Sequence, residues 1–256
     1  MVKLREIIAF LESTIPLELQ DSWDNSGLQV GWDDQEVKRA GFALSVSREV
    51  ISAAKEESLD LIITHHPLTI SGLKVFSPYL YPQNLLLELV KNSISLYALH
   101  TNLDVSPFGP TAIISEFLDL RETEPIVQKP PYGLIGKLPE EVSQEELFQK
   151  LKELLPADVF RVVNYHSSQP VSTVAVCSGS GASFIDAVAG RVDLYITGDV
   201  KYHDAMKAKD LGLTVFDMGH FGTERLFYRK LKKLLESTFP QVDFILLPEK
   251  SPFEVV

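Results

Sequence analysis

The sequence contains a single cysteine, Cys177, so it can form no intrachain disulfide. It also lacks any apolar run close to the roughly 20 residues that a membrane-spanning helix needs. Charged residues, Lys3, Arg5 and Glu6, stand where a signal peptide would need its apolar stretch. We therefore expect a cytoplasmic protein that does not contact a membrane.

Basic residues are fewer than acidic ones, with 24 Lys and Arg against 35 Asp and Glu in 256 residues. The resulting net charge of −11 disfavours general attraction to nucleic acid. The sequence also has no G-x-S-x-G segment, no P-loop and no C-x-x-C pair. These absences remove the support for a serine hydrolase, a P-loop nucleotidase or a zinc ribbon.

What the sequence does have is a regular alternation of strand-like and helix-like segments. Apolar runs rich in β-branched residues predict strands at 41–46, 60–64, 95–99, 172–177, 193–197, 213–217 and 242–247. Helical spacing predicts helices over 2–11, 47–57, 143–154, 202–211 and 222–236. Ser47, Ser143 with Glu146, and Asp199 are the expected N-terminal caps, and Gly212 is an expected helix end. This alternation predicts an α/β fold with a largely parallel sheet.

An internal echo predicts two similar halves. The segments at 60–64 and 193–197 read Asp-Leu-Ile-Ile-Thr and Asp-Leu-Tyr-Ile-Thr, and similar elements precede and follow each. We interpret the echo as a diverged tandem duplication, with chance similarity as the alternative. Tandem prolines within 125–133 predict the boundary, because they end a helix and favour an extended connector. The first half would be 1–125 and the second 126–256, with a return of the C-terminal strand to the first half left open. The site is expected in the cleft between the halves.

Histidines follow several of the predicted strands. His65 and His66 follow the run at 61–64, His100 follows 96–99, and His220 follows 215–219. The C-terminal ends of parallel strands line the ligand crevice of α/β sheets, so we expect these side chains over a cleft. Neighbouring side chains in extended backbone point to opposite sides, so His65 and His66 would fit a pair of ions better than one. A plain surface turn is the alternative for this segment.

Two carboxylates accompany these histidines. Asp104 and Glu224 stand four residues after His100 and His220, a spacing that places both side chains on one face of a helical turn. Glu224 is expected to open the 222–236 helix and to reach back toward His220; an ordinary acid near the helix dipole is the alternative. Imidazole and carboxylate ligands suit zinc, iron or manganese, and a carboxylate can bridge two ions. The sequence therefore predicts a pair of divalent cations bound by His65, His66, Asp104, His220 and Glu224.

Three other features are weaker candidates. The glycine-rich turn at 178–181 could hold a phosphate or be a plain tight turn. The segment at 23–31 could line a pocket, or Trp23 could simply anchor that loop. His203, on the helix expected after Asp199, would reach the cleft or be solvated.

Together these residues resemble the NIF-like family, whose bacterial members are known as GTP cyclohydrolase I type 2 homologs. The match runs from residue 23 to residue 224, in one order, through the segments Trp23–Leu28, Ile63–Pro67, His100–Asp104, Thr197–His203 and Gly219–Glu224. One departure is Ser45, where many members carry an acidic residue, so any role for that carboxylate is absent here.

The resemblance implies two related α/β halves, a dinuclear metal site and a ring-shaped homohexamer. It implies that Glu224 touches both ions and that the ligands are His65, His66, Asp104, His220 and Glu224. His100 lies beside this site in the family pattern, either as a ligand or as a base.

The family name implies hydrolytic opening of the guanine ring of GTP. Two ions could generate hydroxide at neutral pH, and a histidine such as His100 or His203 could then move protons. The residues themselves predict a metal-dependent hydrolase that acts on a nucleotide or a related substrate. The alternative is a non-enzymatic regulatory or scaffold protein with structural metals. Five ligands for two ions leave positions for water or substrate, which favours catalysis.

Overall fold

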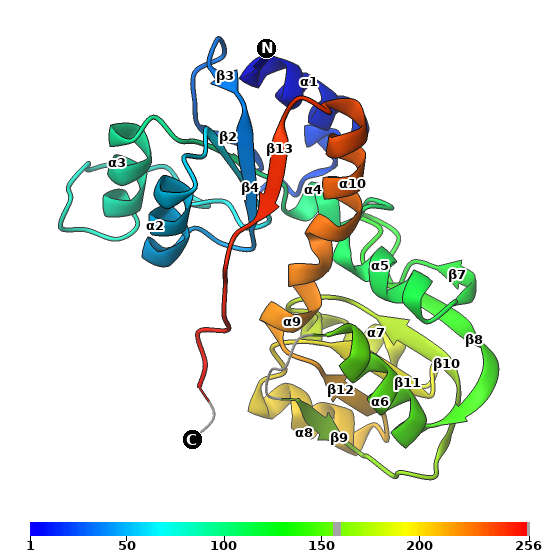
Figure 1. Ribbon diagram of the computed structural model, residues 1–256. Helices are drawn as coiled ribbons and strands as arrows, with labels where there is room; N and C mark the ends of the chain where they lie inside the picture. The colour runs from blue at the N-terminus through cyan, green and yellow to red at the C-terminus, as the bar shows by residue number, and fades with distance from the viewer. Residues whose placement is uncertain (156–159, 255–256) are drawn as a thin grey trace. The chain divides into compact units, whose positions relative to one another are not determined.

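The computed structural model describes residues 1–155 and 160–254 (Figure 1). The chain forms two compact units. Unit 1 combines residues 1–106 with 227–250, and unit 2 combines 107–226 with the residues from 251 onward. The division therefore falls at residue 106, and not at the predicted residue 125. The tandem prolines instead lie in the connection between two strands of unit 2. No helix among the described residues is long and apolar enough to cross a membrane.

The elements of unit 1 come from two segments of the chain, 1–106 and 227–250. In chain order they are β1 (Val2–Lys3), α1 (Leu4–Thr14), the 3-10 helix η1 (Leu17–Leu19), β2 (Gly27–Val30), β3 (Glu36–Val37), β4 (Arg39–Ala43), α2 (Arg48–Glu56), β5 (Leu61–Thr64), α3 (Gln83–Lys91), β6 (Ser95–Ala98), α4 (Thr101–Asp104), α10 (Tyr228–Thr238) and β13 (Asp243–Leu246).

Unit 2 is built from the middle of the chain. Its elements are α5 (Pro110–Phe117), β7 (Arg121–Glu124), β8 (Leu134–Ser143), α6 (Gln144–Leu154), β9 (Arg161–Val163), β10 (Pro170–Val176), the 3-10 helix η2 (Ala182–Phe184), α7 (Ile185–Val188), β11 (Leu194–Thr197), α8 (Tyr202–Asp210), β12 (Thr214–Asp217) and α9 (His220–Glu224), after which the 3-10 helix η3 (Arg225–Phe227) leads into α10.

The main sheet of unit 1 has the strand order β13-β4-β5-β6-β2. All neighbours are parallel except β2, which runs antiparallel to β6. Figure 1 shows α2 and α3 on one face of this sheet and α1 and α10 on the other. Val50 of α2 and Leu89 of α3 pack with Ile62 in one core cluster. On the opposite face Phe42 contacts Phe227 and Phe244, with ring centroids about 6 Å apart.

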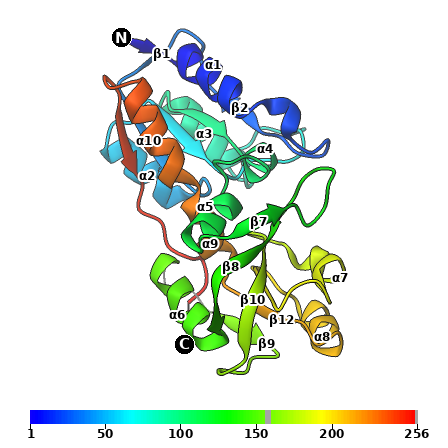
Figure 2. The ribbon, with the colours of Figure 1, turned by 90° about the vertical axis from the view of Figure 1, so that its right-hand side faces the viewer.

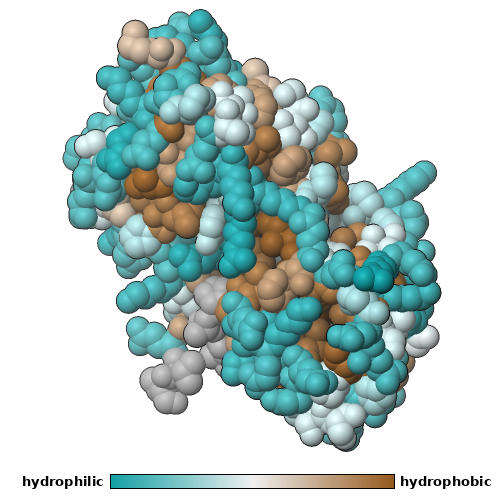
Figure 3. All heavy atoms as spheres, turned by 45° about the vertical axis from the view of Figure 1, so that its right-hand side comes forward, coloured by the Kyte–Doolittle hydropathy of each residue, from teal (hydrophilic) through white to brown (hydrophobic). Residues whose placement is uncertain are grey.

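The sheet of unit 2 has the order β7-β8-β10-β11-β12-β9. Strands β10, β11 and β12 are parallel, whereas β8 and β9 run antiparallel to their neighbours. Helices α5 and α6 cover one face, where Ile114 and Leu151 pack against Ile196. Helix α7 and helix α8 cover the other, where Ile185 and Ala208 pack with Tyr195 (Figure 2). Hydrophilic residues cover much of the face of the molecule that Figure 3 presents.

The α/β prediction is confirmed, and so are most of the local signals behind it. The expected largely parallel sheet is found only in unit 1, because in unit 2 two strand pairs are parallel and three are antiparallel. The Ser47 hydroxyl accepts a hydrogen bond from the Val50 amide, 3.1 Å away, and caps α2. Ser143 and Glu146 form the expected capping box at the start of α6. Gly212 has a φ of +68° just beyond α8, as a helix-ending glycine requires.

Two predicted helix starts were wrong. Lys201, and not Asp199, occupies the N-cap of α8, because Asp199 has a φ of +53° and its carboxylate bonds to another side chain. The helix expected over 222–236 is interrupted: α9 spans His220–Glu224, η3 follows, and α10 begins at Tyr228. The amide of Thr223 donates to the carbonyl of Gly219, so the first turn begins at His220. Glu224 consequently ends a short helix and does not open a long one.

Candidate metal centre

Three histidines come together at the carboxyl ends of β5 and β6 in unit 1. One candidate ligand atom from each of His65, His66 and His100 lies within 4.8 Å of the others. The ring centroids of His65 are 5.2 Å from those of His66 and of His100. We call these three residues the histidine cluster. Parallel strands place it there, since their carboxyl ends meet at one edge of a sheet.

The arrangement of His65 and His66 differs from the one expected of extended backbone. Strand β5 ends at Thr64, and the chain bends at the two histidines. The bend removes the alternation of side chains that a strand would impose. The prediction that the two rings point to opposite sides was therefore wrong.

Each histidine of the cluster is held through its Nδ1 atom. Nδ1 of the fully buried His65 donates to the carbonyl of Leu99 at 2.7 Å, and Nδ1 of His100 donates to Asp24 at 2.8 Å. Nδ1 of His66 lies 2.6 Å from the hydroxyl of Ser45. In His65 and His100 the proton must sit on Nδ1, because carbonyl and carboxylate oxygens are acceptors. This tautomer leaves Nε2 with the lone pair that a metal ion requires.

Two carboxylates accompany the cluster. Oδ1 of Asp104 lies 3.5 Å from Nε2 of His65. The side chain of Asp24 is inaccessible to solvent and accepts hydrogen bonds from His100, Thr101 and Ser26. Burial alone would raise the pKa of Asp24, but the hydrogen bonds from His100 and Thr101 outweigh it and hold the pKa well below its usual range. Asp24 is therefore a fixed negative charge behind His100.

Unit 2 holds the other predicted ligands. At the end of β12, Nε2 of His220 lies 2.7 Å from a carboxylate oxygen of Glu224, which is 5% exposed. Nδ1 of His220 lies 2.8 Å from a carboxylate oxygen of Asp199. Burial lowers the pKa of His220, but the hydrogen bonds to Glu224 and Asp199 outweigh burial and raise it to about 9. The surroundings of this imidazole thus favour positive charge.

The backbone around Glu224 leaves room for its carboxylate only because residue 179 is glycine. A Cβ atom at Gly179 would overlap the carboxylate of Glu224, and the φ of Gly179 is +64°. The hydroxyl of Thr223 accepts from the Gly179 amide at 3.0 Å and so ties this loop to α9. Buried Asp217, at the end of β12, accepts from the amides of Val200 and Gly219.

Within each unit the candidate ligands offer donor atoms that are chemically compatible with a divalent cation. Unit 1 presents imidazole nitrogens with a nearby carboxylate. Unit 2 presents one imidazole beside a buried carboxylate, where a bound cation would replace the proton between His220 and Glu224. Such nitrogen and oxygen donors suit zinc, iron or manganese. The partners of their Nδ1 atoms are of the kind that fixes a histidine as a metal ligand.

The structure also places two other sequence candidates. His203 is exposed on α8, where its ring contacts Tyr202, as expected of the solvated alternative. The loop at 178–181 is not an open anion site. The amides of Ser178, Gly179 and Gly181 donate to threonine hydroxyls. A phosphate at these three amides would have to displace those bonds.

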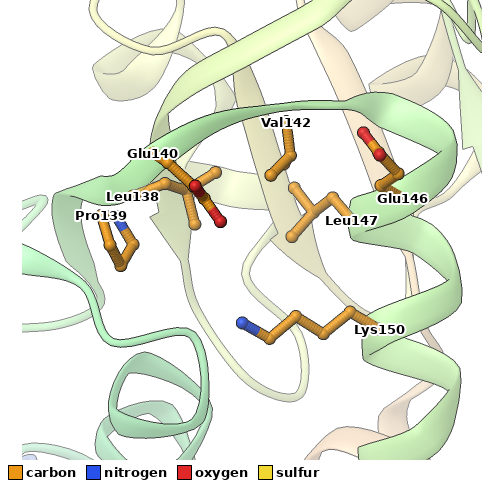
Figure 4. Close-up of a pocket in the computed structure, with 7 residues that line it drawn as sticks. All are labelled: Leu138, Pro139, Glu140, Val142, Glu146, Leu147 and Lys150. Atoms are coloured by element: carbon orange, nitrogen blue, oxygen red, sulfur yellow. The ribbon is translucent and has the colours of Figure 1, made fainter.

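Sequence reasoning missed the residues that orient the histidines. Asp24 lies 76 residues before His100 and Ser45 lies 21 before His66. Only the position of Asp24 beside Trp23, in a polar loop, offered a signal. A small cavity in unit 2 has none of the predicted ligands in its lining. It is lined by Leu138, Pro139, Glu140, Val142, Glu146, Leu147 and Lys150 (Figure 4). Its volume of about 190 Å³ is below the roughly 300–1,000 Å³ of common ligand pockets.

Comparison with known proteins gives a consistent result. The family described as Duf34/NIF3 (NGG1p interacting factor 3) matches residues 2–252. A Campylobacter jejuni protein named GTP cyclohydrolase 1 type 2 homolog is 34% identical over 253 residues, 99% of each chain. A Helicobacter pylori protein named GTP cyclohydrolase 1 type 2 is 35% identical over 239 residues, 93% of each chain.

A solved structure shares the fold. Reduced HcgD from Methanocaldococcus jannaschii superposes with a TM-score of 0.86 at 34% identity. The superposition covers 97% of this chain and 98% of that one.

Proposed function

The chain belongs to the Duf34/NIF3 family, and we propose that it is a hydrolase that depends on two divalent cations and acts on a nucleotide such as GTP. The observation that carries this proposal is the histidine cluster, in which three imidazoles converge at the carboxyl ends of neighbouring parallel strands. Imidazoles that converge in this way repel one another once protonated, and a shared metal ion bound by their neutral forms would remove that repulsion.

The proposed ligands are those of the sequence prediction: His65, His66, Asp104, His220 and Glu224. Their chemistry supports zinc, iron or manganese. Glu224 is the proposed bridging ligand, because its carboxylate has two oxygens and the family resemblance implies this role. Two bound cations would supply Lewis-acid polarisation and a water molecule of lowered pKa.

His100 has a different proposed role. Its Nδ1 donates to Asp24, whose buried carboxylate fixes the orientation of the ring and stabilises the protonated form. This is how a carboxylate supports a histidine that accepts a proton in one step and returns it in the next. We assign His100 the movement of protons at Nε2. His203 takes no part in this proposal, because its side chain is exposed on α8.

GTP is the first substrate to test, since the Helicobacter pylori relative is named for it. The assay follows GTP loss and ring-opened product with protein that has been stripped of metal and then reloaded with zinc, iron or manganese. We expect no activity after chelation and recovery with one of these ions. Activity that persists in protein free of metal by elemental analysis would exclude the proposed chemistry.

Variants separate the roles of the ligands. Glu224→Gln keeps the shape of the side chain but removes its charge and half of its acceptor capacity, so we expect loss of both ions or weak retention of one. Asp104→Asn should weaken mainly one ion. His100→Ala should keep two ions and lose activity, whereas loss of an ion would make His100 a ligand. If Glu224→Gln still holds two ions tightly, Glu224 does not bridge them.

The non-enzymatic alternative makes a different prediction. A regulatory or scaffold protein with structural metals should unfold or lose its assembly on chelation and show no turnover of nucleotides or phosphoesters. The family resemblance also supports a homohexamer, which we propose as the assembly. Light scattering that gives a monomer mass at micromolar concentration would exclude it.

A further inference from the structure

Trp23 is a large hydrophobic residue at an exposed position. The residue is 54% exposed and lies beside the histidine cluster. The centroid of its ring is 5.9 Å from that of His100, and the two rings are almost perpendicular, at 81°. His100 therefore does not cover the indole in a parallel stack. An exposed indole costs hydrophobic free energy, which a ring stacked on its free face would recover.

The loop that carries Trp23 is firmly held on its C-terminal side. The adjacent Asp24 accepts from Nδ1 of His100 and from the amide of Thr101. The side-chain amide of Asn25 donates to the carbonyl of Thr69 at 2.7 Å, and the Ser26 amide donates to Gln20 at 2.9 Å. These bonds give Trp23 a fixed position relative to His100. The indole is thus presented beside a candidate reaction centre at little further cost in conformational entropy.

We propose that Trp23 is an aromatic platform on which the flat heteroaromatic ring of the substrate, a nucleobase, stacks beside His100. The inference rests on the proposed function for the presence of a substrate at His100, but it concerns recognition and not catalysis. Stacking suits this residue because every base has a π face and an indole offers a large one. The same loop then performs two tasks, since Asp24 orients His100 while Trp23 holds the ring of the ligand.

The sequence offers its own fluorescence test, because it has only two tryptophans. Trp32 lies between β2 and β3 and is 44% exposed, which makes it a matched control. Metal-loaded Trp32→Phe protein, whose one indole is Trp23, is titrated with GTP and with tripolyphosphate, which has no base. We expect quenching by GTP and none by tripolyphosphate. The reciprocal variant, Trp23→Phe, should bind GTP without this signal.

Equilibrium dialysis supplies a second measurement that does not depend on fluorescence. Trp23→Ala should weaken GTP binding by at least about fivefold, the lower end of what loss of one base–aromatic stack costs. Trp23→Phe should restore most of the affinity, because phenylalanine keeps an aromatic face. Trp32→Ala should leave it unchanged. Metal content should be the same in all four proteins.

Several outcomes would overturn the proposal. These are equal GTP affinity in Trp23→Ala and the parent protein, equal quenching by tripolyphosphate, and no binding of GTP by the metal-loaded protein. A change of oligomeric mass in Trp23→Ala at unchanged affinity would show that the indole is a subunit contact instead. The result is separable from the proposed function. GTP hydrolysis with no role for Trp23 rejects the platform alone, and Trp23-dependent binding without turnover rejects the hydrolase alone.

Discussion

The two units use the same arrangement of parallel strands but place different residues at its carboxyl edge. In unit 1 the amide of Leu99, after β6, donates to the carbonyl of Thr64 at 2.9 Å. In unit 2 the amide of Met218, after β12, donates to Thr197 at 2.8 Å. The residue after Thr64 is His65, whereas the residue after Thr197 is Gly198. This correspondence is what the predicted duplication would leave behind.

Gly198 accounts for the absence, at this position of unit 2, of a counterpart to the His65 side chain. A Cβ atom on Gly198 would come within 2.8 Å of backbone atoms of Gly179 and Gly219. The loops of unit 2 are therefore too close together for a side chain at the position that corresponds to His65. Unit 1 leaves space there for an imidazole, whereas unit 2 supplies its imidazole, His220, from the following loop. Similar arrangements of parallel strands thus present different side chains through the spacing of their loops.

The loops after β4 and β10 are also fastened differently. In unit 1 one carboxylate, Glu249, accepts from the amides of Leu44 and Ser45 at 2.6 and 3.2 Å. In unit 2 the corresponding amides, Ser178 and Gly179, donate to the hydroxyls of Thr111 and Thr223. A charged acceptor forms stronger hydrogen bonds than a neutral one. The unit 1 loop is therefore held strongly, but both of these bonds depend on one residue, Glu249.

The largest effect is expected from filling the space at Gly179. Gly179→Ala adds a Cβ that overlaps the Glu224 carboxylate and strains a φ of +64°. Backbone strain and overpacking should together lower the free energy of unfolding by about 3 kcal/mol. Displacement of Glu224 should also reduce metal content. Chemical denaturation and elemental analysis measure the two effects.

Gly190→Ala is the matched control for that variant. Gly190 has a φ of +75°, but nothing lies within 4 Å of the added Cβ. Gly190→Ala should lower the free energy of unfolding by about 1–2 kcal/mol through backbone strain alone, and its metal content should be normal. Equal metal loss in the two variants, or none in either, would mean that Gly179 does not make room for the Glu224 carboxylate.

How far the sequence leads can be judged from particular residues. Strands such as β5 and β11 were predictable because they are buried on both faces and read as continuous apolar runs. Strand β8 was not predicted, because its polar, partly exposed residues resemble a loop. Helix α5 was also not predicted, and residues 107–125, which include it, were assigned to the first half although they belong to unit 2. Element order alone does not tell which sheet a helix will cover.

The candidate site shows the same limit. The histidines and carboxylates could be predicted, because they follow apolar runs whose carboxyl ends meet at one edge. Their orienting partners could not, since these bonds join residues far apart in the chain. Glu249 lies 205 residues from Leu44. No local pattern in the sequence encodes such a pairing, which depends on β13 lying beside β4.

A smaller effect is expected from Glu249→Gln, which tests the fastening of the unit 1 loop. The amide side chain keeps one acceptor oxygen but loses the charge. The hydrogen bonds that hold the loop should therefore become weaker by about 1 kcal/mol. Ser45 would then hold His66 less firmly, and metal should dissociate faster from unit 1 ligands. Glu254→Gln, at an exposed position, controls for the change in charge. Metal dissociation to a chelator, followed with time, gives the measurement. Identical rates in both variants would leave Glu249 with no part in orienting His66.

The smallest effects are expected from the two aspartates that begin the echo, Asp60 and Asp193. Asp60 accepts from the amides of Lys38 and Arg39, and Asp193 accepts from the amides of Ser172 and Thr173. The hydroxyl of Thr173 adds a further bond to Asp193. At neutral pH, Asp193→Asn should lower the free energy of unfolding by about 0.5–1 kcal/mol, and Asp60→Asn should lower it slightly less. Both effects are small because both positions are accessible to water.

The pH dependence of Asp193→Asn sharpens this last test. Partial burial raises the pKa of Asp193, but hydrogen bonds from Thr173 and Ser172 outweigh it and lower the pKa below its ordinary value. A carboxylate with a lowered folded pKa contributes stability above its unfolded pKa of about 3.9, and that stability is lost as the pH falls through the folded value. The difference in unfolding free energy between parent and Asp193→Asn should therefore be present at pH 7 and shrink below pH 4. Urea unfolding at pH 7 and about pH 3 measures it. A constant difference across this range would show that the carboxylate charge of Asp193 does not hold β10 to β11.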